Sequence, residues 1–185
     1  DAKQFLSFTS ATKEPGKHPE AVKMAAELAK VTNNLPALML VAVDSEYRTN
    51  YEKAVESYTR ILRDYPAFHP AARNLGLQYF NNPKDCDKAY DLLYKVRDQY
   101  SKDVDFCRAL GILACQRNAY DRAMLLLQSN GGKPAADAEA LFYLAKAQFK
   151  LKKPEARENL ERAVRGGLRK NLEQEAQQML DSLKK

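Results

Sequence analysis

The chain has 185 residues, of which 45% are hydrophobic and 29% charged, and its net charge is +6. This is the composition of a soluble globular protein with enough chain for one substantial core. The positive charge is spread along the sequence without a basic block, so it mildly favours acidic partners and gives no reason to expect nucleic-acid binding. The longest apolar run, Leu35–Val43, is too short to cross a bilayer, so no membrane span is expected.

Residues that favour helix dominate the sequence, and runs of β-branched residues are few, so we expect an all-α fold. Apolar spacing and the breaks between periodic segments predict helices, in chain order, over residues 2–13, 19–32, 36–46, 51 to a stop at Pro66, 70–80, 85–100, 103–117, 120–129, a pair within 137–165, and 171–184. Ser and Thr weaken the first of these, where an extended arm is the alternative. Phe5 and Phe8 occupy its two apolar core positions.

Two breaks between the predicted helices stand out. The segment Gly131–Pro134 is the strongest, and we expect a kink in the stacking of helices there. Gly166 and Gly167 follow the fourth pair of helices in the manner of a helix C-cap.

An internal repeat organises the sequence. Alanines that follow a turn residue and two polar residues recur at steps of 33, 35, 34 and 33, namely Ala21, Ala54, Ala89, Ala123 and Ala156. A second series of small residues keeps the same period: Ala42, Gly76, Gly111 and Ala145. A two-helix unit cannot bury its apolar face alone and must stack on its neighbours. Where two such helices cross closely, only Gly or Ala fits between them.

This pattern resembles the tetratricopeptide repeat, a helical hairpin of 34 residues. The clearest matches are Leu75-Gly76 with Tyr79, Leu110-Gly111, Leu144-Ala145, and the helix with Tyr51, Ala54, Tyr58 and Pro66. The resemblance covers residues 35–168 well and 2–34 weakly, and the chain has no Trp at the bulky position. It implies an α-solenoid, a right-handed superhelix of antiparallel helix pairs.

We therefore expect residues 1–185 to form a single repeat domain. Its predicted parts are a degenerate repeat over 2–34, repeats over 35–68, 69–103, 104–136 and 137–168, and a capping helix over 171–184. The last helix is polar on one side, as a solvated cap requires. Homodimerisation through this terminal helix is the alternative.

A search for catalytic or metal-binding patterns finds none, so we expect no enzyme activity, no cofactor and no metal site. His18 and His69 each stand before a proline that opens a helix, at no metal-ligand spacing. Gly131-Gly132-Lys133 lacks the rest of a phosphate-binding loop. The three cysteines, Cys86, Cys107 and Cys115, form no disulfide framework and are interpreted as small core or groove residues.

The resemblance instead points to a surface. In this family the first helix of each pair lines a concave groove, through its second, fifth, ninth and twelfth repeat positions. Carried over to this chain, the partner-binding residues are Met39, Val43, Arg73, Leu77, Phe80, Arg108, Ile112, Phe142, Lys146 and Phe149, with Cys115 beside them. This set would form an apolar floor with scattered cations, suited to a peptide with apolar anchors and some acidic residues. The alternative is that these helices face a neighbouring segment of the chain, such as the N-terminal arm, or that this register is wrong by one residue.

Two related groove types are not expected. The carboxylate clamp of some family members needs Lys and Asn where this chain has Met39 and Val43, and Asn74 alone is a weak match. Helical-repeat proteins that bind RNA use polar side chains to contact bases, where this chain has apolar ones such as Leu77 and Ile112.

The predicted function is therefore a protein–protein interaction module or scaffold. The alternative is a regulatory or positioning domain excised from a larger protein, enzymatic or involved in envelope assembly, since the chain starts at Asp1 without a methionine or a visible signal peptide. The amino-acid sequences of the repeats are similar to those of bacterial repeat proteins of envelope systems. The sequence leaves the localisation open: we expect a soluble protein, and the bacterial cytoplasm and periplasm are the two candidate compartments.

Overall fold

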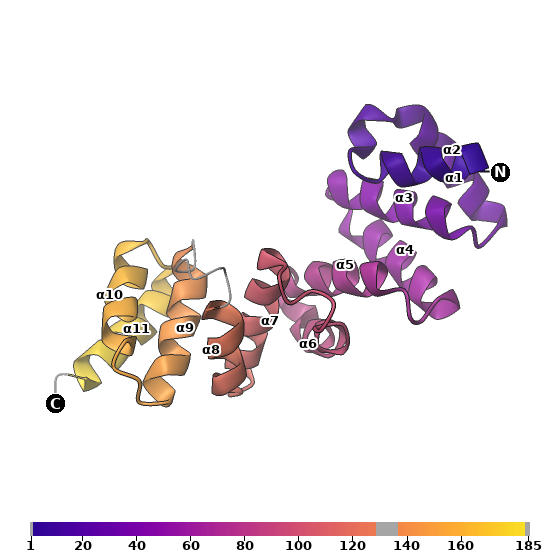
Figure 1. Ribbon diagram of the computed structural model, residues 1–185. Coiled ribbons are helices and arrows are strands. Elements are labelled where there is room, and N and C mark those ends of the chain that lie inside the picture. Colours follow the sequence, from indigo (N-terminus) through magenta and orange to yellow (C-terminus); the bar gives the residue numbers. More distant parts are fainter. Residues whose placement is uncertain (1, 129–136, 184–185) are drawn as a thin grey trace. The chain divides into compact units, whose positions relative to one another are not determined.

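The computed structural model describes residues 2–128 and 137–183, and every regular element within these ranges is a helix (Figure 1). The α-helices are α1 (Ala2–Ala11), α2 (Pro19–Val31), α3 (Leu35–Tyr47), α4 (Tyr51–Asp64), α5 (His69–Phe80), α6 (Cys86–Lys95), α7 (Val104–Gln116), α8 (Tyr120–Gln128), α9 (Ala138–Lys150), α10 (Ala156–Arg165) and α11 (Lys170–Ser182). Two short 3-10 helices, η1 (Pro15–Lys17) and η2 (Pro83–Asp85), lie between them. The all-α prediction is confirmed. The break predicted at Gly131–Pro134 lies outside the described residues.

The chain divides into two compact units, unit 1 (Asp1–Leu92) and unit 2 (Leu93–Lys185), which are described separately. Within each unit, helices that follow one another in the chain pack as neighbours, such as α3 with α4, and α9 with α10. That residues 1–185 act as a single domain stays a prediction.

Short polar side chains and prolines set the helix starts. Four helices begin after a residue whose side-chain oxygen accepts a hydrogen bond from the amide three positions on: Asn34, Asn50, Asp103 and Asp137. Such caps satisfy amides that have no partner within the helix. Proline occupies the first turn of α2, α3 and α5, where its missing N–H costs nothing.

Three helix pairs share one turn geometry. Thr49, Asn118 and Lys152, each two residues after the last residue of a helix, have φ values of 56°, 60° and 55°. The amide of the following residue donates to a carbonyl five positions back, as from Asn50 to Ser45 and from Lys153 to Gln148. This is the Schellman arrangement that closes many helices. Gly167, with φ 85°, confirms the predicted glycine stop after α10.

The end of α6 differs from the prediction. A helix was expected to reach Tyr100, but α6 ends at Lys95 and the chain continues through bonds three residues apart, such as Val96 N–H to the Leu93 carbonyl. The Arg97 guanidinium lies 4.3 Å from the Tyr94 ring centre and donates to the Tyr94 carbonyl. This side chain therefore hydrogen-bonds a carbonyl in the last turn of the shortened helix.

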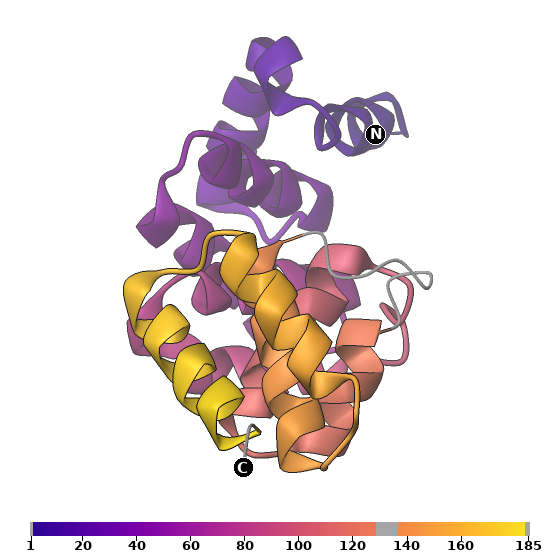
Figure 2. The same ribbon diagram turned by 90° about the vertical axis from the view of Figure 1, so that its left-hand side faces the viewer.

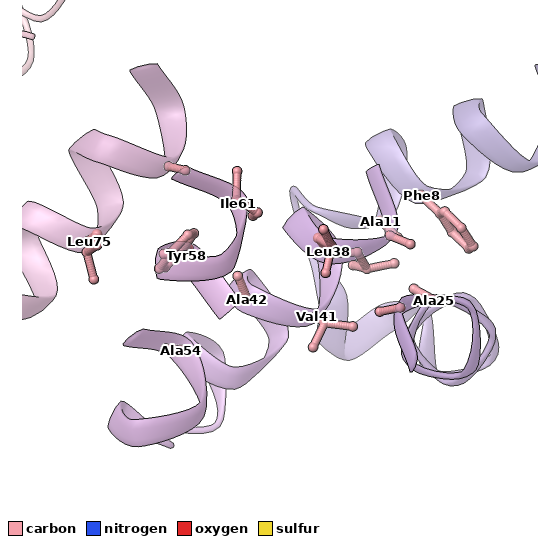
Figure 3. Close-up of a cluster of buried hydrophobic side chains, with 14 residues drawn as sticks. Phe8, Ala11, Ala25, Leu38, Val41, Ala42, Ala54, Tyr58, Ile61 and Leu75 are labelled. Atoms are coloured by element: carbon pink, nitrogen blue, oxygen red, sulfur yellow. The ribbon is translucent and has the colours of Figure 1, made fainter. Parts of the chain in front are cut away.

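Helix α3 forms the centre of unit 1. Figure 3 shows it between two groups of side chains, with Leu38 and Val41 on the side of Ala11 and Ala25, and Ala42 on the side of Tyr58. Arg60 of α4 joins α2 to this core, because its guanidinium donates to the carbonyls of Ala29 and Thr32 at the end of α2. A cation there also faces the negative end of the helix dipole.

The first helix packs less completely than predicted. Phe8 is 1% exposed and belongs to the core of unit 1, but Phe5, expected as a second core residue, is 55% exposed. Thus α1 is a helix rather than an extended arm, yet it buries only one of its two aromatic side chains.

Unit 2 is built on α7 and α9, whose side chains are buried along most of their length. Figure 2 shows α9 and α10 side by side, with α11 next to them, and contacts join each pair of these three helices. The apolar side of α11 is buried, through Leu172, Ala176, Met179 and Leu180. Helix α11 therefore covers the end of the α9–α10 pair, as a cap would.

Small residues lie at the contacts between paired helices, as the repeat predicts. Ala42, Ala54, Ala123, Ala145 and Ala163 are fully buried. At Gly111 a Cβ atom would stand 2.7 Å from Leu127 Cγ of α8, so α7 and α8 approach too closely for even a methyl group.

We therefore expect Gly111→Ala to destabilise the protein. The clash should cost about 1–3 kcal/mol and outweigh the gain of about 1 kcal/mol that alanine brings to a helix interior. Urea denaturation followed by circular dichroism measures the difference. In a Leu127→Ala background the clash is gone, so the same change should be neutral or stabilising. An equal cost in both backgrounds would contradict the steric explanation.

Candidate partner-binding surface

The predicted groove residues of unit 1 come from α3 and α5. Met39 and Val43 lie one turn apart on α3, and Arg73, Leu77 and Phe80 follow one stripe of α5. All five are partly buried, and Met39 and Val43 pack against the core of unit 1. We call these five residues the unit 1 surface.

A polar network connects the helices beneath this surface. The hydroxyl of Tyr58, which is fully buried on α4, donates to Glu46 Oε2 at 2.7 Å and accepts from Asn74 Nδ2 at 2.9 Å. Arg73 Nη1 donates to Asn74 Oδ1 at 2.9 Å. Burial and the adjacent Glu46 carboxylate raise the pKa of Tyr58 well above its ordinary value. The network ties α3, α4 and α5 together, and it holds a cation and a carboxylate close to the apolar side chains.

Two predicted groove residues of unit 2 are core residues. Ile112 is 1% exposed and Phe142 is fully buried, and Cys115 beside them is also buried, so none of them offers a surface to a partner. The reason is the direct packing of α7 on α9, where the Cys115 thiol donates to the Tyr143 carbonyl at 3.5 Å. For these positions the alternative, in which the first helices face a neighbouring segment, describes the structure better.

The two predicted cations of unit 2 are engaged in ion pairs. Arg108 contacts Asp137 at 2.6 Å and Glu139 at 3.1 Å, and Lys146 contacts Glu175 of α11 at 2.6 Å. Burial alone would lower the pKa of Lys146, but Glu175 raises it overall, so the lysine stays charged. These pairs join α7 to α9 and α9 to α11. Phe149, the last predicted groove residue, is partly buried at the end of α9.

The described residues contain no cluster of three or more His, Cys, Asp and Glu side chains arranged to hold a metal ion. Cys107 and Cys115 are buried on α7, as interpreted from the sequence, and Cys86 is partly buried. Burial raises the pKa of the Cys115 thiol to about 11, which keeps it protonated at neutral pH. None of the described helices has the length and apolar character needed to cross a membrane.

Glu46 and Asn74 were not among the predicted partner-binding residues, although both lie beside them. Glu46 is at the twelfth position of its repeat, which the resemblance places in the groove, and Asn74 matches one position of a carboxylate clamp. Only the structure shows that the Tyr58 hydroxyl joins the two.

Replacing Tyr58 by phenylalanine tests this network. We expect a loss of about 1 kcal/mol near neutral pH, because Glu46 and Asn74 lose a shared buried partner. A tyrosine whose folded-state pKa is raised contributes stability below its unfolded pKa and loses it as pH rises further. Thermal denaturation between pH 8 and 11 should therefore show wild type losing stability faster than Tyr58→Phe. Tyr47→Phe, at an exposed tyrosine of α3, is the matched control, and parallel slopes for all three proteins would contradict the assignment.

The ion pair between Arg108 and Asp137 predicts that the stability of the fold decreases at low pH. Burial alone would raise the pKa of Asp137, but Arg108 and the amides of α9 prevail and lower it. Such a carboxylate stabilises the fold above its unfolded pKa, and this contribution is lost as pH falls through the folded pKa. Asp137→Asn keeps the helix cap and removes the charge, so it should cost less than about 1 kcal/mol at pH 7. The gap to wild type should close below pH 4 in urea titrations, and a gap that persists at pH 2 would contradict this.

Comparisons with known proteins match two of the helical hairpins, α3–α4 and α9–α10, to a known repeat. Residues 37–67 and 139–165 match a sequence model of the tetratricopeptide repeat. This chain is also similar to a solved tetratricopeptide repeat protein from Parabacteroides merdae ATCC 43184, with 19% sequence identity and a TM-score of 0.52. The similarity covers 97% of this chain and 82% of the Parabacteroides protein. Among curated proteins no significant match is found. Two hairpins of this chain therefore match the tetratricopeptide repeat, and its helical fold is similar to that of a tetratricopeptide repeat protein.

Proposed function

We propose that the chain is a protein–protein interaction module that binds a peptide segment of its partner across the unit 1 surface. Tetratricopeptide repeats in general mediate interactions between proteins. The observation that carries the proposal is the contrast between the two units at equivalent repeat positions. Met39, Val43 and Leu77 keep part of their apolar surface exposed, whereas Ile112 and Phe142 are buried.

The chemistry of the unit 1 surface favours a peptide with apolar anchors. Partly exposed apolar side chains gain free energy when a partner covers them. Arg73 and Glu46 stand beside them and would set the register of polar groups on the peptide, and Arg73 favours an acidic residue. Because the Tyr58 network fixes Glu46 and Asn74, binding would require little reordering of α3 and α5.

The proposed role is that of a scaffold without catalytic activity. The alternative, a domain that positions a larger enzyme or an envelope assembly, would use the same surface. It differs in placing further domains beside this one in the complete protein.

A capture experiment with a matched pair of variants tests the proposal. Leu77→Glu places a charge in the unit 1 surface, and Leu6→Glu makes the same change at an exposed leucine of α1. We expect proteins captured from source lysate by wild type and by Leu6→Glu to be lost with Leu77→Glu, while circular dichroism shows all three folded. Arg73→Glu is a second variant in case Leu77→Glu unfolds. Captured proteins that survive both surface changes would exclude this surface.

A further inference from the structure

A second surface lies in unit 2 and shares only Phe149 with the predicted groove residues. The end of α9, the turn into α10 and the end of α11 enclose a hollow of ≈ 570 Å³, within the range of ligand pockets. It is lined by Phe149, Lys150, Lys152, Lys153, Pro154, Arg157 and Leu183. We call it the cationic hollow.

The described lining of the hollow combines an apolar floor with four cations. Phe149, Pro154 and Leu183 are its apolar members, and Leu183 is 39% exposed. The other four members are lysines and an arginine, and no carboxylate of residues 2–128 or 137–183 lines the hollow. Within the described ranges, Lys150, Lys152 and Lys153 form no ion pair, and Arg157 has only a long, exposed contact of 3.4 Å with Glu161.

Helix ends account for only part of this charge. Lys150 and Lys152 lie at the C-terminal end of α9, where a cation offsets the helix dipole. Arg157 lies in the first turn of α10, at the positive end of that helix, where a cation is unfavourable. Arg157 is thus unfavourable for its own helix, yet it adds a fourth positive charge around the exposed apolar side chains. Residues that break a local rule in this way are often found at binding sites.

We propose that the cationic hollow binds an acidic peptide segment, with one large apolar side chain inserted against Phe149 and Leu183 and carboxylates around it. Charge complementarity selects the occupant, since the four cations attract an anionic chain and repel a basic one. The apolar floor provides the anchor site that a purely electrostatic patch lacks. This site is independent of the unit 1 surface and would give the module a second point of attachment.

Fluorescence anisotropy with a labelled peptide Glu-Asp-Phe-Asp-Glu tests the proposal. We expect saturable binding to the full chain that weakens as salt rises, because exposed charges are screened. Lys152→Glu/Lys153→Glu should weaken binding about tenfold, since it reverses two of the four cations. Leu183→Ser should weaken it about threefold or more by removing part of the floor.

Matched controls separate this site from general attraction. Lys13→Glu/Lys23→Glu makes the same charge change at two exposed lysines of unit 1 and should alter affinity less than twofold. A peptide with Ala in place of Phe should bind at least fivefold more weakly. Both hollow variants change exposed side chains, and circular dichroism confirms that they fold.

Several results would overturn the proposal. These are no saturable binding by wild type, an equal loss in the unit 1 lysine control, and equal affinity for the Ala peptide. Vesicles of phosphatidylcholine with 30% phosphatidylserine provide the last arm. If they bind wild type through Lys152 and Lys153 while the peptide does not, the occupant is a membrane surface and the peptide proposal is wrong.

Discussion

The close approach of paired helices is the constraint on which the rest of this structure depends. Ala42, Ala54, Ala123 and Ala145 are fully buried, and at Gly111 no methyl group would fit. Backbones this close allow the larger residues one turn away, such as Tyr58 and Leu127, to fill the space around the contact. The spacing of small residues therefore sets both the repeat length and the positions of the large core residues.

Polar contacts then determine how neighbouring hairpins join. In unit 1 the buried Tyr58 hydroxyl bridges Glu46 and Asn74, and in unit 2 ion pairs connect α7 with α9 and α9 with α11. A buried hydroxyl without partners would be costly, so these contacts favour one arrangement of the helices over others. The two units use the same hairpin but leave different parts of it exposed.

The sequence predicts the helices well because their determinants are local. Asn34 and Asp137 cap helices, Pro70 opens one, and the alanine series marks the contacts. It fails where tertiary packing decides. At the early end of α6 Arg97 packs on the Tyr94 ring and donates to its carbonyl, and the burial of Ile112 and Phe142 reflects the packing of α7 on α9. A periodic pattern predicts which side of a helix a side chain lies on, but not how far neighbouring helices bury it.

The shared turn has a consequence for how side chains are displayed. Thr49, Asn118 and Lys152 occupy one backbone conformation that other amides of the turn already fix. Their side chains are therefore attached to a rigid backbone, although they lie at the surface. Such a position can change its chemistry from repeat to repeat without disturbing the helices that it connects. Lys152 places a positive charge at such a turn. A ligand that binds there would contact an ammonium group whose backbone is already ordered, so binding would cost little backbone entropy.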